Sequence, residues 1–524
     1  MLVAASAMAG PAAEKPRRGG TFKIGAWTEP EHLNPILVQS GLEREIARLI
    51  FLDVAFFDDK TNWTTPLLEV FPSIANGGIS KDGRTWTLKV KKGIRWHDGV
   101  AVTSADFAFS FKAATDPKVE FPAKQDLEVV ASVETPDDYT VVYHLKRRSG
   151  TLHEYVPPVV PAHILSKEAD FGHAAYNQMP VGNGPFEIQE WKRGSHIVLR
   201  RRHDAPPDGP PWLDKVIFKF VPDENARWVE MRSGGIDMHR TSNLDVLASA
   251  KEAKGMRIVP VINTNWTNLG FNLKSPAVSD RRVREAFVRA IDKVGIAAKV
   301  TRQRPVVIYG LAAPAARYYS DDVPKFPYDP VRAGALLDEA GWKLGKNGMR
   351  EKEGKKLVIR LTTLSGSKPW QDLQVIFQDS LKHVGVTLTL ENYPGNKFYG
   401  SSDSGGILNS GDFDIALMAW GGYSPYVMGR QLYHSTACPP SGSNYGRYAN
   451  AEVDRLLEEA EADPDPLVQA KLSAKAQRQV IADLAVFPLY VYDSAHVLRD
   501  TVRGYSPGPF STYAWNSADW WLAE

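Results

Sequence analysis

The sequence predicts an α/β protein with two or three domains. Its 524 residues exceed the roughly 250–300 residues at which a single hydrophobic core stops growing. Helices and strands alternate after residue 271, as they do in parallel sheets, whereas residues 181–220 contain several strands in succession. The two blocks are therefore expected to belong to different domains.

Composition excludes some classes of partner. The 63 basic and 61 acidic residues leave a net charge of +2, and no block of like charge indicates nucleic-acid binding. The single cysteine, Cys438, permits no intramolecular disulfide and no cysteine-based metal cluster. Hydrophobic residues make up 43% of the chain, which is typical of a globular protein.

Residues 1–19 are expected to be a signal-peptide remnant or a disordered tail. A short Ala-rich apolar run ends in small residues near Ala12 and Ala13, as at a secretory cleavage site, but a basic start is missing. No other stretch approaches the roughly 20 apolar residues of a membrane span. We therefore expect an exported protein that does not insert into the membrane.

The N-terminal half begins with a predicted strand at 21–27 and a helix from Glu43, where Ile46, Leu49 and Ile50 share one face. A module of strands and helices follows at about 60–180. Its expected elements are an alternating strand from Trp86, a helix capped by Thr103 or Ser104, and a strand at 138–145.

The C-terminal half shows the clearest helices. One follows Ser279 or Asp280, with Val283, Ala286 and Phe287 on a single apolar face. The other expected elements are helices at 329–342, 370–385, 453–460 and 466–484, and strands at 268–273, 386–391, 413–418 and 486–493.

The stretch after the strand at 413–418 is the best candidate for a binding site. Two glycines and a proline force a loop and let the backbone approach a ligand closely, and large aromatic rings accompany them. Ligands of open α/β sheets collect beyond the carboxyl ends of strands. The candidate residues are Trp420, Gly421, Gly422, Tyr423, Ser424 and Tyr426.

No catalytic or metal motif is recognisable. The chain has no HExxH, CxxC, Walker loop or G-x-S-x-G elbow, which favours a non-catalytic binding protein without a cofactor or bound metal. A secreted hydrolase remains an alternative, because two acids can meet in space from any positions. Buried paired carboxylates in the cleft would favour the hydrolase, and an aromatic cleft without acids would favour the binding protein.

Several stretches together resemble the extracellular solute-binding proteins of ABC importers, family 5, the dipeptide, oligopeptide and nickel class. They occur in the family's order and cover nearly the whole chain. The stretches are LNPIL at 33–37, ISKDGRTWTLKVKKGIRWHDGVAVTSADFAFSF at 79–111, VGNGPFEIQEWKRGSHIVLRR at 181–201, FNLKSPAVSDRRVREAFVRAID at 271–292, DPVRAGALLDEAGW at 329–342 and NYGRYANAEVDRLLEEA at 444–460.

The resemblance implies a two-lobed clamshell with an extra inserted domain and mixed sheets flanked by helices. Lobe I would comprise 20–60, 181–270 and 485–524, the inserted domain 61–180, and lobe II 271–484. The expected function is that of a monomeric periplasmic receptor. It would capture a peptide-like or other small polar solute between the lobes and deliver it to an ABC permease, with an opine, oligosaccharide or metal chelate as the alternative solute.

The resemblance also assigns ligand contacts. Peptide binders of this class typically carry an acid a few residues after the tryptophan, where it pairs with the peptide's α-ammonium. Here no acid lies between Asp414 and Glu452. A buried ammonium without a counter-charge is costly, so an ordinary peptide with a free amine is a weaker expectation for this chain than for a typical member of the family. Arg430 reverses the local charge and would either pair with a carboxylate or phosphate or point to solvent.

Further cleft candidates follow from matched positions in the family. Trp266 is expected either to stack on the ligand or to pack against the hinge, and His434 has no clustered partners that would make a metal site. The remaining candidates are Gln39, Ser40, Gly41, Asn265, Asn444 and Tyr445.

Overall fold

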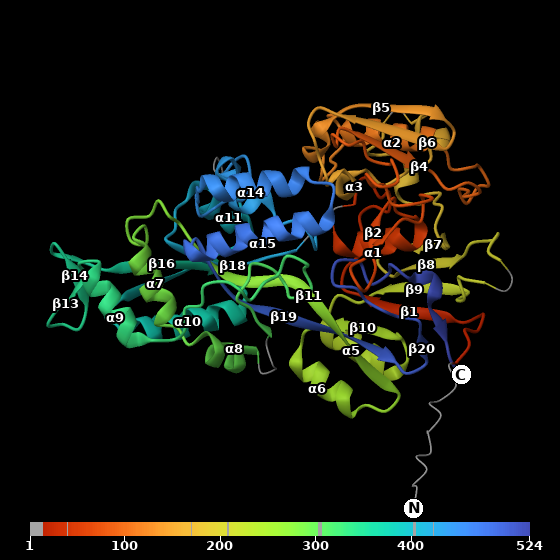
Figure 1. Ribbon diagram of the computed structural model, residues 1–524. Helices are drawn as coiled ribbons and strands as arrows, with labels where there is room; N and C mark the ends of the chain where they lie inside the picture. Colours follow the sequence, from red (N-terminus) through yellow and green to blue (C-terminus); the bar gives the residue numbers. More distant parts are fainter. Residues whose placement is uncertain are drawn as a thin grey trace, which may run out of the picture.

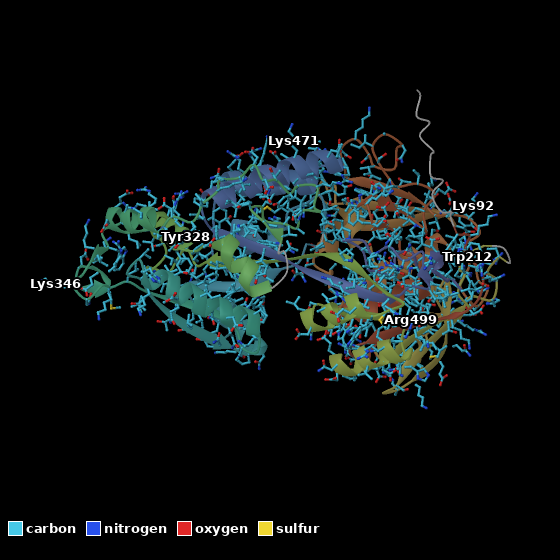
Figure 2. The ribbon with its side chains drawn as sticks, turned by 90° about the horizontal axis from the view of Figure 1, so that it is seen from below. Lys92, Trp212, Tyr328, Lys346, Lys471 and Arg499 are labelled. Atoms are coloured by element: carbon cyan, nitrogen blue, oxygen red, sulfur yellow. The ribbon has the colours of Figure 1, made fainter. Side chains whose placement is uncertain are left out.

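A computed structural model describes residues 14–524 except 39, 169, 207–208, 302–305, 402–404 and 423. The molecule is elongated, with one lobe at each end and a smaller domain above lobe I (Figure 1). Seen from below, Lys346 lies near one end and Lys92 and Trp212 lie toward the other (Figure 2). Within the described part of the chain, no helix has the length and apolar character needed to cross a membrane.

Lobe I is built on β1, which pairs in parallel with both β9 and β10, while β7, β8 and β9 pair antiparallel in turn. Phe22 and Phe218 are fully buried beneath this sheet. The elements of the lobe are β1 (Thr21–Ala26), α1 (Gly41–Ile50), β2 (Phe56–Phe57), β3 (Trp63–Thr64), β7 (Phe186–Lys192), β8 (His196–Arg201), β9 (Lys215–Phe220), α5 (Glu224–Ser233), β10 (Met238–Thr241), α6 (Leu244–Glu252), β20 (Val502–Arg503) and β21 (Trp521–Leu522). β3 is grouped with lobe I because it pairs with β2, although its residues fall in the range 61–180 expected for the inserted domain.

Two long strands, β11 (Met256–Phe271) and β19 (Val486–Arg499), run from one lobe to the other (Figure 1). They pair antiparallel along most of their length, with a register shift between Ile262 and Trp266. At one end β19 pairs with β10, and at the other β11 pairs with β18 (Ile415–Trp420). Both strands extend beyond the segments expected from sequence, and a single sheet thereby spans both lobes.

Lobe II shows the predicted alternation, since β16 pairs in parallel with β17 and with β18. Asp280 and Asp329 cap α7 and α9 through their side chains, as the sequence pattern of the first helix predicted. The further elements are α7 (Arg281–Arg289), α8 (Lys293–Thr301), β12 (Val306–Val307), α9 (Pro330–Glu339), β13 (Lys343–Leu344), β14 (Arg350–Lys352), β15 (Lys355–Lys356), β16 (Val358–Leu364), α10 (Lys368–Lys382), β17 (Thr387–Tyr393), α11 (Gly395–Phe398), α12 (Ile407–Ser410), α13 (Arg430–Tyr433), α14 (Ala451–Ala462) and α15 (Pro466–Ala482).

The inserted domain is a three-stranded antiparallel sheet in the order β4-β6-β5, with α2 packed against it. Trp86, Trp96 and Phe107 are buried in the same continuous core as Phe22 of lobe I, so this domain and lobe I pack as one body. Its elements are β4 (Thr85–Lys89), α2 (Ser104–Thr115), β5 (Val130–Asp137), β6 (Thr140–Leu145), α3 (Leu152–Tyr155) and α4 (Ala162–Leu165).

Candidate ligand-binding site

Trp420 is the last residue of β18, whereas the sequence placed it on the loop that follows. The strand keeps its ladder with β11 to the end, where Trp420 lies opposite Trp266. Its half-buried indole stacks on Tyr445, with ring centroids 5.7 Å apart and an interplanar angle of 22°. The sheet therefore fixes Trp420 more firmly than a loop would.

Trp266 is only 2% exposed and packs in a core cluster with Tyr426, Met428 and Tyr433 that also includes Phe57 of β2. Its ring also lines a small cavity that is described below. Trp266 therefore packs in the core and also borders the cavity.

The two glycines after Trp420 lie where side chains would clash. A Cβ on Gly421 would come within 2.8 Å of Asn265 Oδ1, and a Cβ on Gly422 would come within 3.1 Å of the Phe510 ring. Glycine therefore lets this loop pass close to β11 and to the C-terminal segment.

Ser424 connects the loop to the inserted domain. Its Oγ donates a hydrogen bond of 2.6 Å to Glu154 Oε1 on α3, and it accepts from Tyr426 N at 3.2 Å. Sequence inspection found no acid near this loop because Glu154 lies 270 positions away along the chain.

Tyr426 connects the same loop to lobe I. Its hydroxyl donates to Thr61 O at 3.1 Å, in the turn between β2 and β3. Arg317 of lobe II reaches the same turn, donating from Nε to Thr61 Oγ1 and from Nη2 to Lys60 O, each at 3.0 Å. The lobes thus touch through a few side chains.

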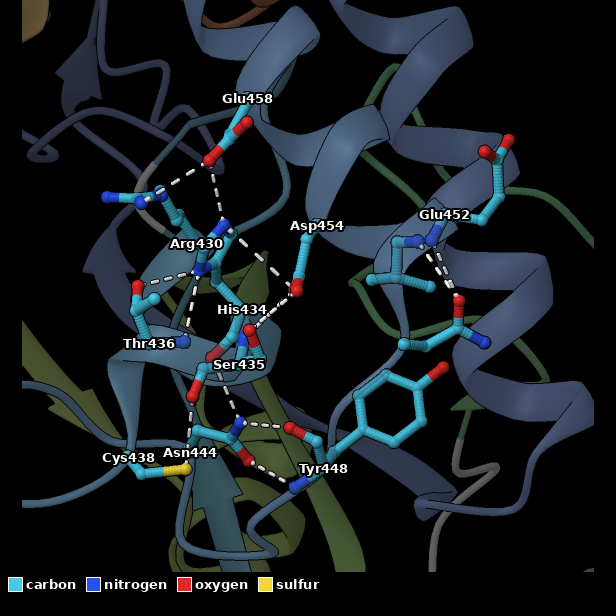
Figure 3. Close-up of polar contacts among 12 residues, drawn as sticks. Arg430, His434, Ser435, Thr436, Cys438, Asn444, Tyr448, Glu452, Asp454 and Glu458 are labelled. Atoms are coloured by element: carbon cyan, nitrogen blue, oxygen red, sulfur yellow. Dashed lines mark hydrogen bonds and ion pairs between the residues drawn. The ribbon is translucent and has the colours of Figure 1, made fainter.

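Arg430 lies beside two carboxylates of α14. Its Nη2 is 3.8 Å from Glu458 Oε1, and its Nε is 4.0 Å from Glu461 Oε2 (Figure 3 shows the contact with Glu458). These separations exceed the usual hydrogen-bond range of about 2.7–3.2 Å, so the pairs are loose.

The Asn444 side chain links the backbone at His434 to the backbone at Tyr448. Its Nδ2 donates to the carbonyls of His434 and Tyr448 at 3.0 and 2.8 Å, and its Oδ1 accepts from Tyr448 N at 3.0 Å (Figure 3). His434 is 3% exposed and contacts Glu458 Oε1 at 3.1 Å through Nε2. Within the described ranges no three His, Cys, Asp or Glu side chains form a group that could hold a metal ion.

Ser40 has a structural function at the start of α1. Its Oγ accepts from Glu43 N at 3.2 Å, while Glu43 Oε2 accepts from Ser40 N at 2.9 Å, which completes a capping box. Gly41 is the first residue of that helix and is exposed. Gln39 and Tyr423 lie outside the described residues.

A cavity of about 340 Å³ lies between α1, the β2–β3 hairpin, the inserted domain and the C-terminal segment. Its volume falls within the roughly 300–1,000 Å³ of small-molecule sites. Buried polar atoms without a hydrogen-bond partner among the described residues include Arg48 Nη1, Trp63 Nε1 and His153 Nδ1. These three residues line the cavity, as do the aromatic side chains of Phe51, Phe56, Phe57, Phe121, Tyr155 and Phe510.

A second cavity of about 60 Å³ adjoins the first, and both are lined by Glu154 and Tyr155. The smaller cavity reaches lobe II, where Trp266, Gly421 and Ser424 contribute to its wall. Glu154 and Tyr155 therefore stand between a cavity lined by lobe I and the inserted domain and a smaller one lined by lobe II.

Two carboxylates line the smaller cavity, so the cleft is not the acid-free cleft named above as favouring a binding protein. Burial raises the pKa of Glu154 to about 7, although the Ser424 hydrogen bond opposes the shift and Glu461 adds to it. Burial likewise raises the pKa of Glu461 to about 7, against the opposing charge of Arg430. The aromatic walls favour binding, while the paired acids are the feature expected of a hydrolase.

Two lobes joined by long crossing strands, with an inserted domain packed on one of them, are typical of the class of two-lobed solute-binding proteins. Residues 69–439 match the family described as "Bacterial extracellular solute-binding proteins, family 5 Middle", and the chain belongs to this family. This confirms the resemblance, the α/β clamshell class and the solute-binding function expected from sequence.

Related proteins and solved structures support the same family assignment. The chain is 28% identical over 521 residues to the oligopeptide-binding protein AppA of Bacillus subtilis, covering 98% of this chain and 93% of AppA. The dipeptide-binding protein of Escherichia coli is 26% identical over 515 residues, with 92% of this chain and 91% of that protein covered. The AppA structure in complex with a nonapeptide superposes with a TM-score of 0.75 over 97% of this chain and 100% of AppA.

A further solved structure shares the fold alone. AgaA from A. tumefaciens R10, solved in complex with agropinic acid, has a TM-score of 0.71 at 24% identity and covers 96% of this chain and 99% of its own. Members of this fold therefore include proteins solved with quite different solutes.

Proposed function

We propose that the protein is a periplasmic receptor that captures a peptide-like or other small polar solute between its lobes and delivers it to an ABC import permease. The observation that carries the proposal is the pair of adjoining cavities, which share Glu154 and Tyr155 and which together draw walls from both lobes and the inserted domain. A solute that fills them would contact both lobes at once and so favour the closed arrangement.

The proposed site consists of the residues predicted from sequence together with those the structure adds. Trp266 would supply aromatic surface to the smaller cavity. Trp420 and Tyr445 would supply it from a neighbouring cavity of about 30 Å³ that they line with Asn444. Ser424 and Tyr426 would link solute binding to closure. Gly421 and Gly422 would admit the backbone close to the solute. Gln39, Gly41, Tyr423 and Asn265 remain expected contacts by position in the family, whereas Ser40 and Asn444 would act by holding backbone in place.

Several features of the receptor belong to the proposal as well. The apolar N-terminal run would direct export, and the oligopeptide- and dipeptide-binding relatives are binding proteins rather than enzymes. The protein would act as a monomer with a permease as its partner. A non-peptide solute is the second candidate, because AgaA, which shares this fold, was solved in complex with agropinic acid.

A thermal-shift screen of the purified protein tests the proposal. The additives would be pools of di- to pentapeptides, opines, oligosaccharides and nickel–histidine. A true solute at 100 times its dissociation constant should add about 2.7 kcal/mol of stability. The peptides should also be recovered intact after incubation, because turnover would support a hydrolase that uses Glu154 and Glu461. No shift with any pool would contradict the proposal.

A further inference from the structure

A further cavity of about 250 Å³ lies in lobe I, where the end of α1 meets the segment before β7 and the C-terminal segment. We call it the lateral cavity. Leu52, Pro185 and Trp515 contribute to its wall, and the described residues that line it belong to lobe I except for Pro66 of the inserted domain. Because lobe I and the inserted domain pack as one body, the lateral cavity does not depend on lobe closure.

Asn183 is a buried donor in the wall of the lateral cavity. Its side chain is fully buried, and its Oδ1 accepts a hydrogen bond of 2.8 Å from Leu52 N, which fixes the orientation of the amide. Its Nδ2 has no hydrogen-bond partner among the described residues. Buried polar groups in native proteins are nearly always paired with protein or water. The free end of this amide therefore indicates a guest that carries an acceptor atom.

Arg48 supplies a second donor and a positive charge. It lies in the last turn of α1, where its guanidinium carbon is 4.5 Å from the centroid of the Phe56 ring. Its Nη2 is 2.5 Å from Asp53 Oδ2, whereas its Nη1 is buried and has no partner within the described part of the chain. Asp53 thus occupies one arm of the guanidinium, and the other arm is left for a second acceptor.

Backbone contacts hold these two donors at the same end of α1. Leu52 N donates to Asn183, and Gly184 N donates to Ile50 O at 2.7 Å. The segment that carries Asn183 is therefore tied to the residues that directly follow the last turn of α1. Since Arg48 belongs to that turn and lines the same cavity, one guest can accept from both side chains.

The charges at this end of α1 favour an anionic guest. Arg44 adds positive potential at both Arg48 and Asp53, so two guanidinium groups surround one carboxylate. Arg202 also lines the cavity but is already paired, because its Nη2 donates to Asp204 Oδ2 at 2.9 Å and its Nη1 to Asn183 O at 3.0 Å. The unused hydrogen-bonding capacity of the site thus consists of donors beside a positive charge.

We propose that the lateral cavity is a second binding site, which takes a small organic carboxylate. Its oxygens accept from Asn183 Nδ2 and Arg48 Nη1, since guanidinium and amide donors suit a carboxylate. The volume of about 250 Å³ lies below the roughly 300–1,000 Å³ of ordinary small-molecule sites, which limits the guest to a few carbon atoms. Its apolar part lies against Pro185, Pro210, Pro211 and Trp515.

This site goes beyond the proposed function and does not rest on it. Arg48 and Asp53 line the 340 Å³ cavity as well, so a substitution of either residue would not tell the two cavities apart. Ala518 lines the lateral cavity and Ala123 lines the larger one, and both are partly exposed. These two alanines therefore allow each cavity to be filled separately.

Fluorine NMR of the full chain tests the proposal with two probes that differ in one group. The probes are para-fluorobenzoate and para-fluorobenzyl alcohol, titrated separately. The carboxylate should bind saturably, and the alcohol should bind at least tenfold more weakly because it carries no charge for Arg48. Inorganic phosphate at the same concentration should not displace the bound benzoate, because phosphate has no apolar part for the proline and tryptophan wall.

Variants place the bound probe. Ala518→Phe fills the lateral cavity and should weaken benzoate binding at least tenfold, whereas Ala123→Phe, the matched control, should leave it unchanged. Asn183→Asp is an independent variant, which keeps the acceptor for Leu52 N but replaces the donor by a carboxylate oxygen. It should also weaken binding at least tenfold. Circular dichroism and thermal unfolding check that each variant folds.

Each other outcome would overturn the lateral site. Binding that is lost in Ala123→Phe and kept in Ala518→Phe would place the probe in the larger cavity. Equal affinity for the two probes, or no binding of either, would remove the carboxylate site, and displacement by phosphate would make it a pocket for inorganic anions. These results leave the proposed function untouched, because the thermal-shift screen tests solute capture separately.

Discussion

The lobes of this protein are joined in two different ways. The β11–β19 ladder is a run of backbone hydrogen bonds between two long strands, and it passes through both lobes. The second connection is a set of contacts across the cleft: Tyr426 and Arg317 reach the β2–β3 turn, and Ser424 reaches Glu154. Phe57 also packs beside Tyr426, and Gly150 N donates to Glu461 O. The ladder can persist in any lobe arrangement, whereas the side-chain contacts can form only when the lobes meet.

This difference shows where solute binding can act. Breaking the ladder would cost many backbone hydrogen bonds, each worth about 0.5–1.5 kcal/mol net, so it serves as the permanent connection. The contacts across the cleft are individually weak, and a ligand that binds the closed state more tightly than the open state would add to them. The predictions below weaken the side-chain contacts, or the solute surface beside them, and leave the ladder in place.

The largest effect is expected from Trp420→Ala. Truncation removes the ring that stacks on Tyr445, and large aromatic side chains at binding surfaces contribute on the order of 2–4 kcal/mol. Solute affinity should fall about 100-fold or more in calorimetry, with an unchanged circular-dichroism spectrum. Tyr328→Ala is the control, because this aromatic residue of lobe II is 55% exposed (Figure 2). Unchanged affinity in Trp420→Ala would refute the site assignment.

Arg317→Ala should have a smaller effect on affinity. It removes two hydrogen bonds to the β2–β3 turn, and such bonds from a charged donor contribute about 1.5–3 kcal/mol before solvent exposure weakens them. Apparent solute affinity should drop about tenfold because the closed state is less favoured. Arg332→Ala, which breaks an exposed ion pair with Glu339, should have no such effect. Equal affinities in the two variants would show that the turn does not contribute to closure.

Glu154→Gln should change the pH dependence of stability. The pKa of Glu154 is about 7 in the folded chain against 4.5 as its ordinary value, so the folded state holds the proton longer. Its contribution to the free energy of unfolding is therefore full below pH 4.5 and is lost as pH rises through 7. The variant should gain on the order of 1 kcal/mol relative to wild type between pH 5 and pH 8 in urea titrations.

A constant difference between variant and wild type across this pH range would contradict the raised pKa. The quantity to compare is the difference in the free energy of unfolding between variant and wild type, measured at each pH, because other buried groups titrate as well. Burial lowers the pKa of His153 and of His496 to about 3, and both contributions cancel when variant and wild type are compared.

The smallest effect is expected from Tyr426→Phe. The change removes the hydroxyl that donates to Thr61 O but keeps the ring in the core cluster with Phe57 and Trp266. Loss of one neutral hydrogen bond corresponds to about 0.5–1.5 kcal/mol, or several-fold in affinity. Isothermal titration should detect this reduction, and an affinity equal to that of wild type would show that the hydroxyl is equally satisfied by water.

Much of the scaffold could be predicted from the sequence because its signals are local. The apolar face of α7, its cap at Asp280 and the alternation of strands and helices after residue 271 require only neighbouring residues. The glycine-rich loop after Trp420 was also located. The ends of β11 and β19 were missed because their pairing partners, not their own residues, decide how far the strands continue.

The chemistry of the site was less predictable. Glu154 approaches Ser424 across 270 positions, and Glu461 reaches the same cavity from a helix whose pattern indicates only an amphipathic segment. The loop lacks an acid, and from sequence this disfavoured free-amine solutes. The three-dimensional structure brings two acids to the loop, and no spacing rule could have indicated them.

The most direct test of solute-driven closure is the distance between the lobes. Spin labels at Lys92→Cys and Lys346→Cys, in a Cys438→Ser background, report from the inserted domain and from lobe II (Figure 2). Pulsed electron spin resonance should show a shorter, narrower distance distribution when a solute identified by the thermal-shift screen is added, and Trp420→Ala should abolish the change. Identical distributions with and without a solute that native mass spectrometry shows to be bound would contradict closure between the lobes.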